Sequence, residues 1–242
     1  MSELNSVNPA ARMDQLENLV FRQARWVVLL FVGLLWAIKF LEMGFGISVY
    51  EFGILPRTLS GLIGILTAPL LHADLYHLIS NSLPLIILGL GLFYFYPRIA
   101  WEVAGWLYLI TGFWVWAAAR GGSYHIGASG VVYALAAYLI VGGIVRKHVR
   151  LMTISMAVLI LYGGIFYGVL PGDPGISWES HLLGAVSGAF MAIYFRKEPI
   201  WTIPKPPPKE ELVGEEEPGE MSHTHMNANA EFTYTFRPKE EE

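Results

Sequence analysis

The chain has 242 residues, of which 54% are hydrophobic and 15% charged, and its mean hydropathy of +0.46 indicates that most of it lies in a lipid bilayer. It has no cysteine, which excludes disulfides and cysteine-based metal or nucleophile sites. The formal net charge of −4 arises from residues 197–242, with 11 acidic and five basic residues, so we expect no nucleic-acid partner.

The predicted elements begin with a short polar segment, residues 1–24, followed by six apolar stretches. A transmembrane helix needs about 20 apolar residues. Residues 58–71 are apolar too, but they are fewer and include Gly61, Gly64 and Pro69, which predicts a loop in the membrane interface. The predicted crossings are residues 26–41, 75–96, 99–119, 129–145, 151–170 and 176–195. The predicted fold is therefore all-α, a polytopic bundle of six transmembrane helices.

The distribution of Lys and Arg predicts the orientation of this bundle. Six crossings place both termini on one side of the membrane. With the N-terminus inside, eight basic residues fall on the inner side and only Arg57 and Arg120 on the outer side, so the positive-inside rule favours both termini inside. We therefore predict a cytoplasmic segment 1–24, a membrane domain 25–196 and a disordered, acidic cytoplasmic tail 197–242. Short loops and the lack of a targeting presequence favour a bacterial inner membrane.

Four polar side chains fall at one depth under this topology. The second, fourth and sixth crossings all run inward, and they carry His77 and Asn81, Ser129, and His181 close to their outer ends. A hydroxyl and an imidazole are costly to bury in hydrocarbon, so each needs a partner, a wet cavity or a catalytic reason. A serine and a histidine at one depth suggest a nucleophile and its base.

The spacing of these residues indicates an oxyanion site. His77 and Asn81 are four residues apart and share one face of a helix, and Ser129 at a helix start has an unpaired backbone N–H beside its hydroxyl. Gly127 would permit a tight turn at the nucleophile. His77 and Asn81 could instead be a structural hydrogen-bonding pair, and His72 and His125 are interpreted as structural or interfacial.

Two further patterns bear on the position of His181. Tyr133 lies one turn after Ser129, where its ring could pack against the imidazole of His181, although plain core packing is the simpler interpretation. Ser180, Gly184 and Gly188 repeat every four residues, which lets two helix backbones approach closely. If the fourth crossing is the partner, this stripe brings the imidazole within reach of the hydroxyl.

Three motifs in order carry a family resemblance: His77-Leu-Ile-Ser-Asn81, Gly127-Ala-Ser-Gly130 with the following Val-Val-Tyr-Ala-Leu, and His181-Leu-Leu-Gly184. Together with the six-crossing layout, they resemble the rhomboid family of intramembrane serine proteases. The resemblance implies a catalytic dyad of Ser129 and His181, with His77, Asn81 and the Ser129 amide as oxyanion donors. Ser180 departs from the family pattern, which usually has Ala before this histidine.

The expected activity is therefore hydrolysis of transmembrane helices of membrane proteins near the outer face, by a serine and a histidine without a third member. Residues 171–175 could act as a hinge or lid. No cofactor or metal is expected, and neither the substrate nor the oligomeric state follows from the sequence. A silent relative that binds transmembrane clients, and a transporter or channel, are the alternatives.

Overall fold

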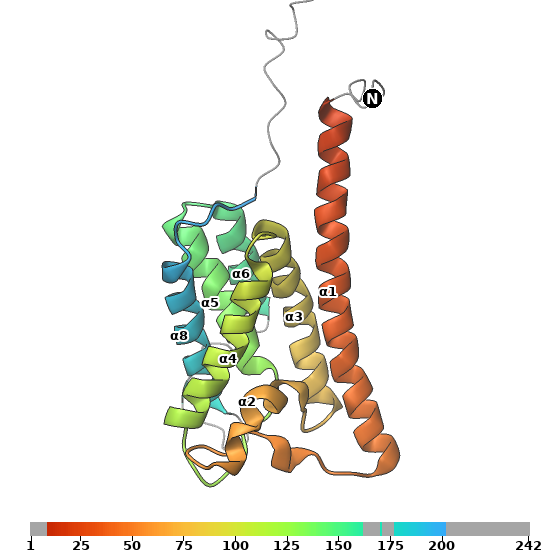
Figure 1. Ribbon diagram of the computed structural model, residues 1–242, viewed down its shortest axis with the longest axis vertical. Helices are drawn as coiled ribbons and strands as arrows, with labels where there is room; N and C mark the ends of the chain where they lie inside the picture. The colour runs from red at the N-terminus through yellow and green to blue at the C-terminus, as the bar shows by residue number, and fades with distance from the viewer. Residues whose placement is uncertain (1–8, 162–169, 171–176, 202–242) are drawn as a thin grey trace, which may run out of the picture. The chain divides into compact units, whose positions relative to one another are not determined.

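The computed structural model describes residues 9–161, 170 and 177–201, whose arrangement is shown in Figure 1. Every regular element within these residues is a helix. In chain order they are α1 (Pro9–Phe45), the 3-10 helices η2 (Tyr50–Phe52) and η3 (Ser60–Leu62), α2 (Gly64–Thr67), the 3-10 helix η4 (Ala68–Leu70), α3 (Leu75–Phe95), α4 (Ala100–Ala118), α5 (Ser129–Val145), α6 (Val149–Leu161) and α8 (Trp178–Tyr194).

Four of the predicted crossings are helices in the structure, and their ends agree closely with the predicted ones. α3, α4, α5 and α8 each begin and end within two residues of their predicted bounds. α6 covers the first part of the predicted stretch 151–170. The rest of that stretch up to residue 169, the proposed hinge at 171–175 and the tail from residue 202 lie outside the described residues.

α1 is longer than the predicted crossing 26–41, because the polar residues before it continue the same helix. Pro9 occupies its first position, where the missing N–H costs nothing, and residues 10–32 contain neither Gly nor Pro. The helix ends before Gly46, whose φ of +63° is a left-handed conformation common after helix ends.

Two of the described helices are long and apolar enough to cross a membrane by length and composition, Asp14–Phe45 and Leu75–Phe95. α5 is equally apolar but has 17 residues. Its composition reflects its position, because it packs against α3, α4, α6 and α8, and 11 of its residues are buried. A helix that is apolar all round is an interior helix, and α5 is the core of this bundle.

α5 and α8 run side by side with their backbones in close contact (Figure 1). A Cβ added at Gly184 would lie 2.1 Å from the carbonyl oxygen of Gly130, and one added at Gly188 would lie 2.0 Å from that of Ala134. Both positions therefore require glycine. The contacts advance along both helices together, so the two helices are parallel and their N-termini lie at the same end.

Residues 58–71, predicted as an interfacial loop, form η3, α2 and η4 and pack against α4. The hydroxyl of Tyr108 on α4 donates to the carbonyl of Leu66 at 2.5 Å. Arg57 precedes this segment, and its guanidinium donates to the carbonyl of Ala119 at 2.6 Å, at the end of α4. These bonds tie the segment between α1 and α3 to the helix that leads toward α5.

Candidate active site

Ser129 and His181 meet where α5 and α8 begin. Ser129 is the first residue of α5, and His181 lies in the first turn of α8. The Nε2 atom of His181 is 2.8 Å from the Oγ atom of Ser129, a hydrogen-bond distance, and both residues are half-buried. Parallel packing of the two helices explains this meeting, because it places both N-termini at one end.

The ring of His181 is held by an aromatic contact. Tyr133 lies one turn after Ser129 on α5, is 8% exposed, and stacks on the imidazole with ring centroids 4.3 Å apart and an angle of 8° between the planes. The contact expected from the sequence is present. A parallel stack restricts the imidazole to one plane, which orients its Nε2 atom toward the hydroxyl.

Glu179, the acidic residue close to His181 on α8, is paired with an arginine. Glu179 is 6% exposed, and its Oε1 atom lies 3.2 Å from the Nε atom of Arg120, in the segment before α5. This ion pair links the start of α8 to that segment.

His77 lies across from the turn before Ser129. Gly127 has a φ of +109°, and a Cβ added there would lie 2.6 Å from the Nε2 atom of His77. Glycine is therefore required at position 127 for both conformation and space. The N–H of Ala73 points to the Nδ1 atom of His77 at 3.5 Å, which makes Nδ1 the acceptor and assigns the ring proton to Nε2. The Nε2–H group is thus a donor at the edge of the candidate site.

Asn81 is bonded to the backbone of its own helix. Its side chain is 4% exposed, and its amide donates to the carbonyl of His77 at 2.8 Å, within α3. One of its two N–H donors is therefore used inside the helix. Asn81 and His77 are therefore joined at the start of α3.

The family model described as Rhomboid domain matches residues 60–198 of this chain, which include all of these side chains. The chain belongs to the rhomboid family. An uncharacterized protein of Mycobacterium tuberculosis is 36% identical over 189 residues, which cover 71% of this chain and 77% of the relative. An uncharacterized protein of Mycobacterium leprae is 34% identical over 190 residues, covering 71% and 73%. The family match and the two long apolar helices together identify the chain as a rhomboid-family membrane protein.

In this rhomboid-family chain, a buried lysine anchors the loop that leads to His77, a role the sequence did not suggest. Lys39 of α1 is 7% exposed, and its ammonium donates to the carbonyls of His72 and Ala73 at 2.9 and 3.0 Å and to Glu42 at 2.9 Å. A lysine within an apolar helix needs such partners. Lys39 is the one charged residue in the apolar stretch 26–41, and this was the sequence feature that could have indicated a buried, partnered lysine.

His72 connects the two sides of the rhomboid site. Its ring is 5.1 Å from that of His77 between centroids, and its Nε2 atom accepts the N–H of Ala128 at 3.5 Å, next to Ser129. Burial, and then the neighbouring His77, lower the pKa of His72 from 6.5 to about 4. A neutral ring is required here, because Nε2 must accept.

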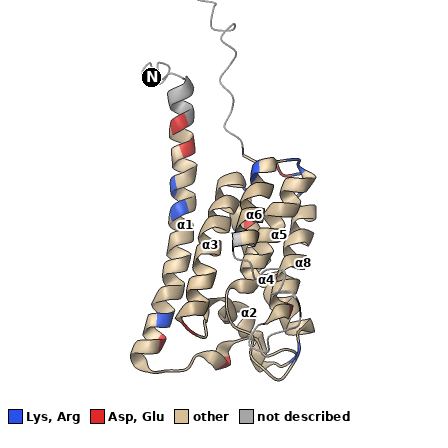
Figure 2. Cartoon of the chain, turned by 180° about the vertical axis from the view of Figure 1, so that it is seen from behind, with Lys and Arg blue, Asp and Glu red and all other residues tan. Residues whose placement is uncertain are grey.

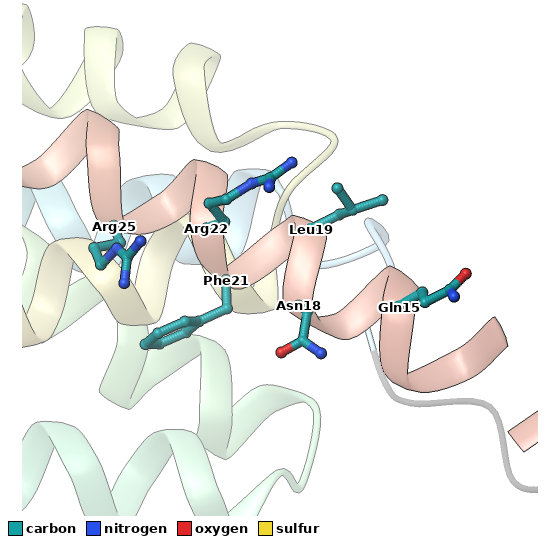
Figure 3. Close-up of a pocket in the computed structure, with 6 residues that line it drawn as sticks. All are labelled: Gln15, Asn18, Leu19, Phe21, Arg22 and Arg25. Atoms are coloured by element: carbon teal, nitrogen blue, oxygen red, sulfur yellow. The ribbon is translucent and has the colours of Figure 1, made fainter. Parts of the chain in front are cut away.

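Two hollows among the described residues bear on the position of the site. One of about 20 Å³, enough for about one water molecule, is bordered by Gly127, Gly130, Thr111, His125 and Ser180. The other, about 520 Å³, lies along the N-terminal half of α1 and contains none of the candidate site residues (Figure 3). Its lining is Gln15, Asn18, Leu19, Phe21, Arg22 and Arg25. Of these two, the smaller hollow borders the candidate site.

Proposed function

We propose that this rhomboid-family protein is an intramembrane serine endopeptidase that hydrolyses peptide bonds in or near transmembrane helices of other membrane proteins. The observation that carries the proposal is the 2.8 Å contact between Nε2 of His181 and Oγ of Ser129. A serine hydroxyl is a weak nucleophile until a neighbouring base takes its proton, and this contact supplies that base.

The proposed reaction is acyl transfer through a covalent intermediate. The Ser129 oxygen attacks the carbonyl carbon of the substrate peptide while His181 takes the hydroxyl proton at Nε2. His181 then returns this proton to the leaving amine, and the acyl chain remains on Ser129. Water, deprotonated by the same imidazole, releases the acyl group as a carboxylic acid and restores the hydroxyl.

Two donors are proposed to stabilise the oxyanion of each tetrahedral intermediate. The N–H of Ser129 is unpaired at the start of α5, and the Nε2–H of His77 borders Gly127. Asn81 is proposed as a further oxyanion donor through the second N–H of its amide, since the first donates to the His77 carbonyl. Stacking on Tyr133 is proposed to help orient the base.

We propose a six-crossing arrangement with both termini in the cytoplasm and the site near the outer face of a bacterial inner membrane. Figure 2 supports it, since α3 and α5 lack Lys and Arg along their length and α1 has no charged residue between residues 26 and 38. The inner end would hold Arg22, Arg25, Arg98, Arg146, Lys147, Arg150 and Arg196.

The cysteine-free chain allows a direct test of this orientation. Ser123→Cys, in the exposed segment before α5, should react with a membrane-impermeant maleimide added to intact cells. The matched variant Arg98→Cys, between α3 and α4, should react only after lysis. The reverse pattern would overturn the orientation.

The activity itself is tested by placing purified protein in lipid vesicles with a model single-span substrate. Cleavage by the natural chain that disappears in Ser129→Ala and in His181→Ala supports the proposal. Binding of the substrate without cleavage by the natural chain would indicate a silent relative. Ion or solute flux across the vesicles that is unchanged in Ser129→Ala, without cleavage, would indicate a transporter or channel.

A further inference from the structure

His125 lies where the segment before α5 meets the start of α8. Its backbone pairs with that of Ile54, with N···O distances of 2.8 and 2.9 Å in the two directions. Its ring is 4% exposed, with Nε2 3.1 Å from the carbonyl oxygen of Arg120 and Nδ1 2.5 Å from the hydroxyl oxygen of Ser177. Backbone and ring together fix this side chain firmly.

The partners of His125 determine the direction of its hydrogen bonds. A carbonyl oxygen can only accept, so Nε2 carries the ring proton and donates to Arg120. Nδ1 is then an acceptor, and the hydroxyl of Ser177 donates to it. The hydroxyl of Ser180, 2.6 Å from that of Ser177, must therefore donate to Ser177. This gives one directed chain of bonds from α8 to the segment before α5.

Ser177 joins this chain to the backbone of His181. It immediately precedes α8, where a serine side chain usually caps the helix, but its hydroxyl makes no cap bond. Its carbonyl accepts the N–H of Ser180 at 3.0 Å and that of His181 at 3.3 Å. Ser177 therefore links the two histidines. Its hydroxyl is bonded to the ring of His125, and its carbonyl is bonded to the backbone N–H of His181.

We propose that His125 is a positioning residue, which fixes the first turn of α8 through Ser177 and thereby holds the imidazole of His181 against Ser129. The inference rests on the proposed protease function. The charged groups facing His125 are Arg120, on its own segment, and Glu179 of α8, which are paired with each other at 3.2 Å. Burial lowers the pKa of His125, which favours the neutral ring that accepts from Ser177.

The test compares four single variants and one double variant of the full chain by the rate of labelling with a small fluorophosphonate and by kcat and KM on a model substrate. His125→Phe keeps a ring but removes both bonds, and Ser177→Ala removes the link. Each should lower the labelling rate and kcat about tenfold with KM within about twofold, since one lost hydrogen bond of about 1.4 kcal/mol corresponds to tenfold.

Two variants serve as matched controls. His125→Asn keeps one acceptor and one donor and should retain activity within about threefold of the natural chain. Ser180→Ala removes a hydroxyl from the same turn but leaves the link between His125 and Ser177, so we expect a change within about twofold. The double variant His125→Phe/Ser177→Ala should be no slower than either single variant, because both break the same link.

Failure of this inference is distinguishable from failure of the proposed function. If the natural chain labels and His125→Phe and Ser177→Ala label equally fast, the inference is overturned while the protease proposal stands. If the natural chain does not label, the protease proposal fails, and amide hydrogen exchange over residues 178–184 becomes the readout. Faster exchange in His125→Phe but not in Ser180→Ala supports the positioning role, and unchanged exchange overturns it.

Discussion

The start of α5 and α8, with Ser129 and His181, combines close backbone packing with the polar bonds of Ser177 and Glu179, whereas the start of α3, with His77, is held by polar bonds. On the first side, the glycines of α8 touch carbonyl oxygens of α5 directly. On the second side, Lys39 binds two carbonyls, and Asp74 accepts the N–H of His77 at 2.7 Å. The two sides should therefore fail in different ways.

The packed side should be sensitive to any atom added between α5 and α8. The polar side has some freedom of shape, since Lys39 reaches its partners through a flexible stem. It also depends on ionisation, because the ring of His72 must be neutral to accept the N–H of Ala128. The four predictions that follow separate these two kinds of control.

The largest effect is expected for Gly184→Ala. The added Cβ would lie 2.1 Å from the Gly130 carbonyl oxygen, so α8 must shift and carry His181 with it. We expect the fluorophosphonate labelling rate to fall more than about 100-fold, and the free energy of unfolding to fall by about 3 kcal/mol. Gly105→Ala on α4 is the control, since a Cβ there has no neighbour within 4 Å. Equal labelling by both variants would mean that close α5–α8 packing does not position the dyad.

Lys39→Met should have the next largest effect, on the polar side. It leaves the carbonyls of His72 and Ala73 without their donor, at a cost of about 2 kcal/mol in unfolding free energy. Because the loop that positions His77 is loosened, kcat should fall while KM is kept. Lys197→Met, at an exposed position, controls for loss of charge. A stable Lys39→Met variant with normal kcat would show that Lys39 does not position His77.

Acid should destabilise the polar side through His72. Its folded pKa of about 4 lies below the ordinary 6.5, so its contribution to stability is present above pH 6.5 and is lost as the pH falls toward 4. At pH 5 the loss is about 2 kcal/mol. Unfolding measured in detergent at pH 7 and pH 5 should show this decrease, and it should be smaller in His72→Gln. An equal decrease in both proteins would show that protonation of His72 is not the cause of the lost stability.

Tyr133 should give the smallest of these effects. Tyr133→Leu removes the stack on the imidazole, so we expect the labelling rate to fall about tenfold, corresponding to about 1.4 kcal/mol. Tyr133→Phe keeps the ring and should label within about twofold of the natural chain. A slow Tyr133→Phe variant would show that the hydroxyl, and not the ring contact, is what matters.

The sequence was informative where a pattern is periodic. The spacing of Ser180, Gly184 and Gly188 predicted a close helix contact, and the position of Tyr133 one turn after Ser129 predicted its contact with His181. Both follow from helix geometry alone. The helix ends of α3, α4, α5 and α8 were likewise predictable, because apolar runs end at charges, Gly or Pro.

The polar anchors were not predictable in the same way. Lys39 and His72 are 33 residues apart and meet only because α1 packs on α3, which no local pattern encodes. His125 and Ser177 meet across 52 residues for a similar reason. The continuation of α1 to Pro9 was missed because polarity was interpreted as the end of the helix, although its residues are good helix formers.

The most direct test of the account is to map the covalent adduct that a fluorophosphonate forms with the purified chain. Attack on phosphorus expels fluoride and leaves the phosphonyl group on the nucleophile, which peptide mass spectrometry identifies. We expect one adduct, on the peptide that contains Ser129, and its loss in His181→Ala. An adduct on another serine, or an undiminished Ser129 adduct in His181→Ala, would contradict the assignment of these two residues as nucleophile and base.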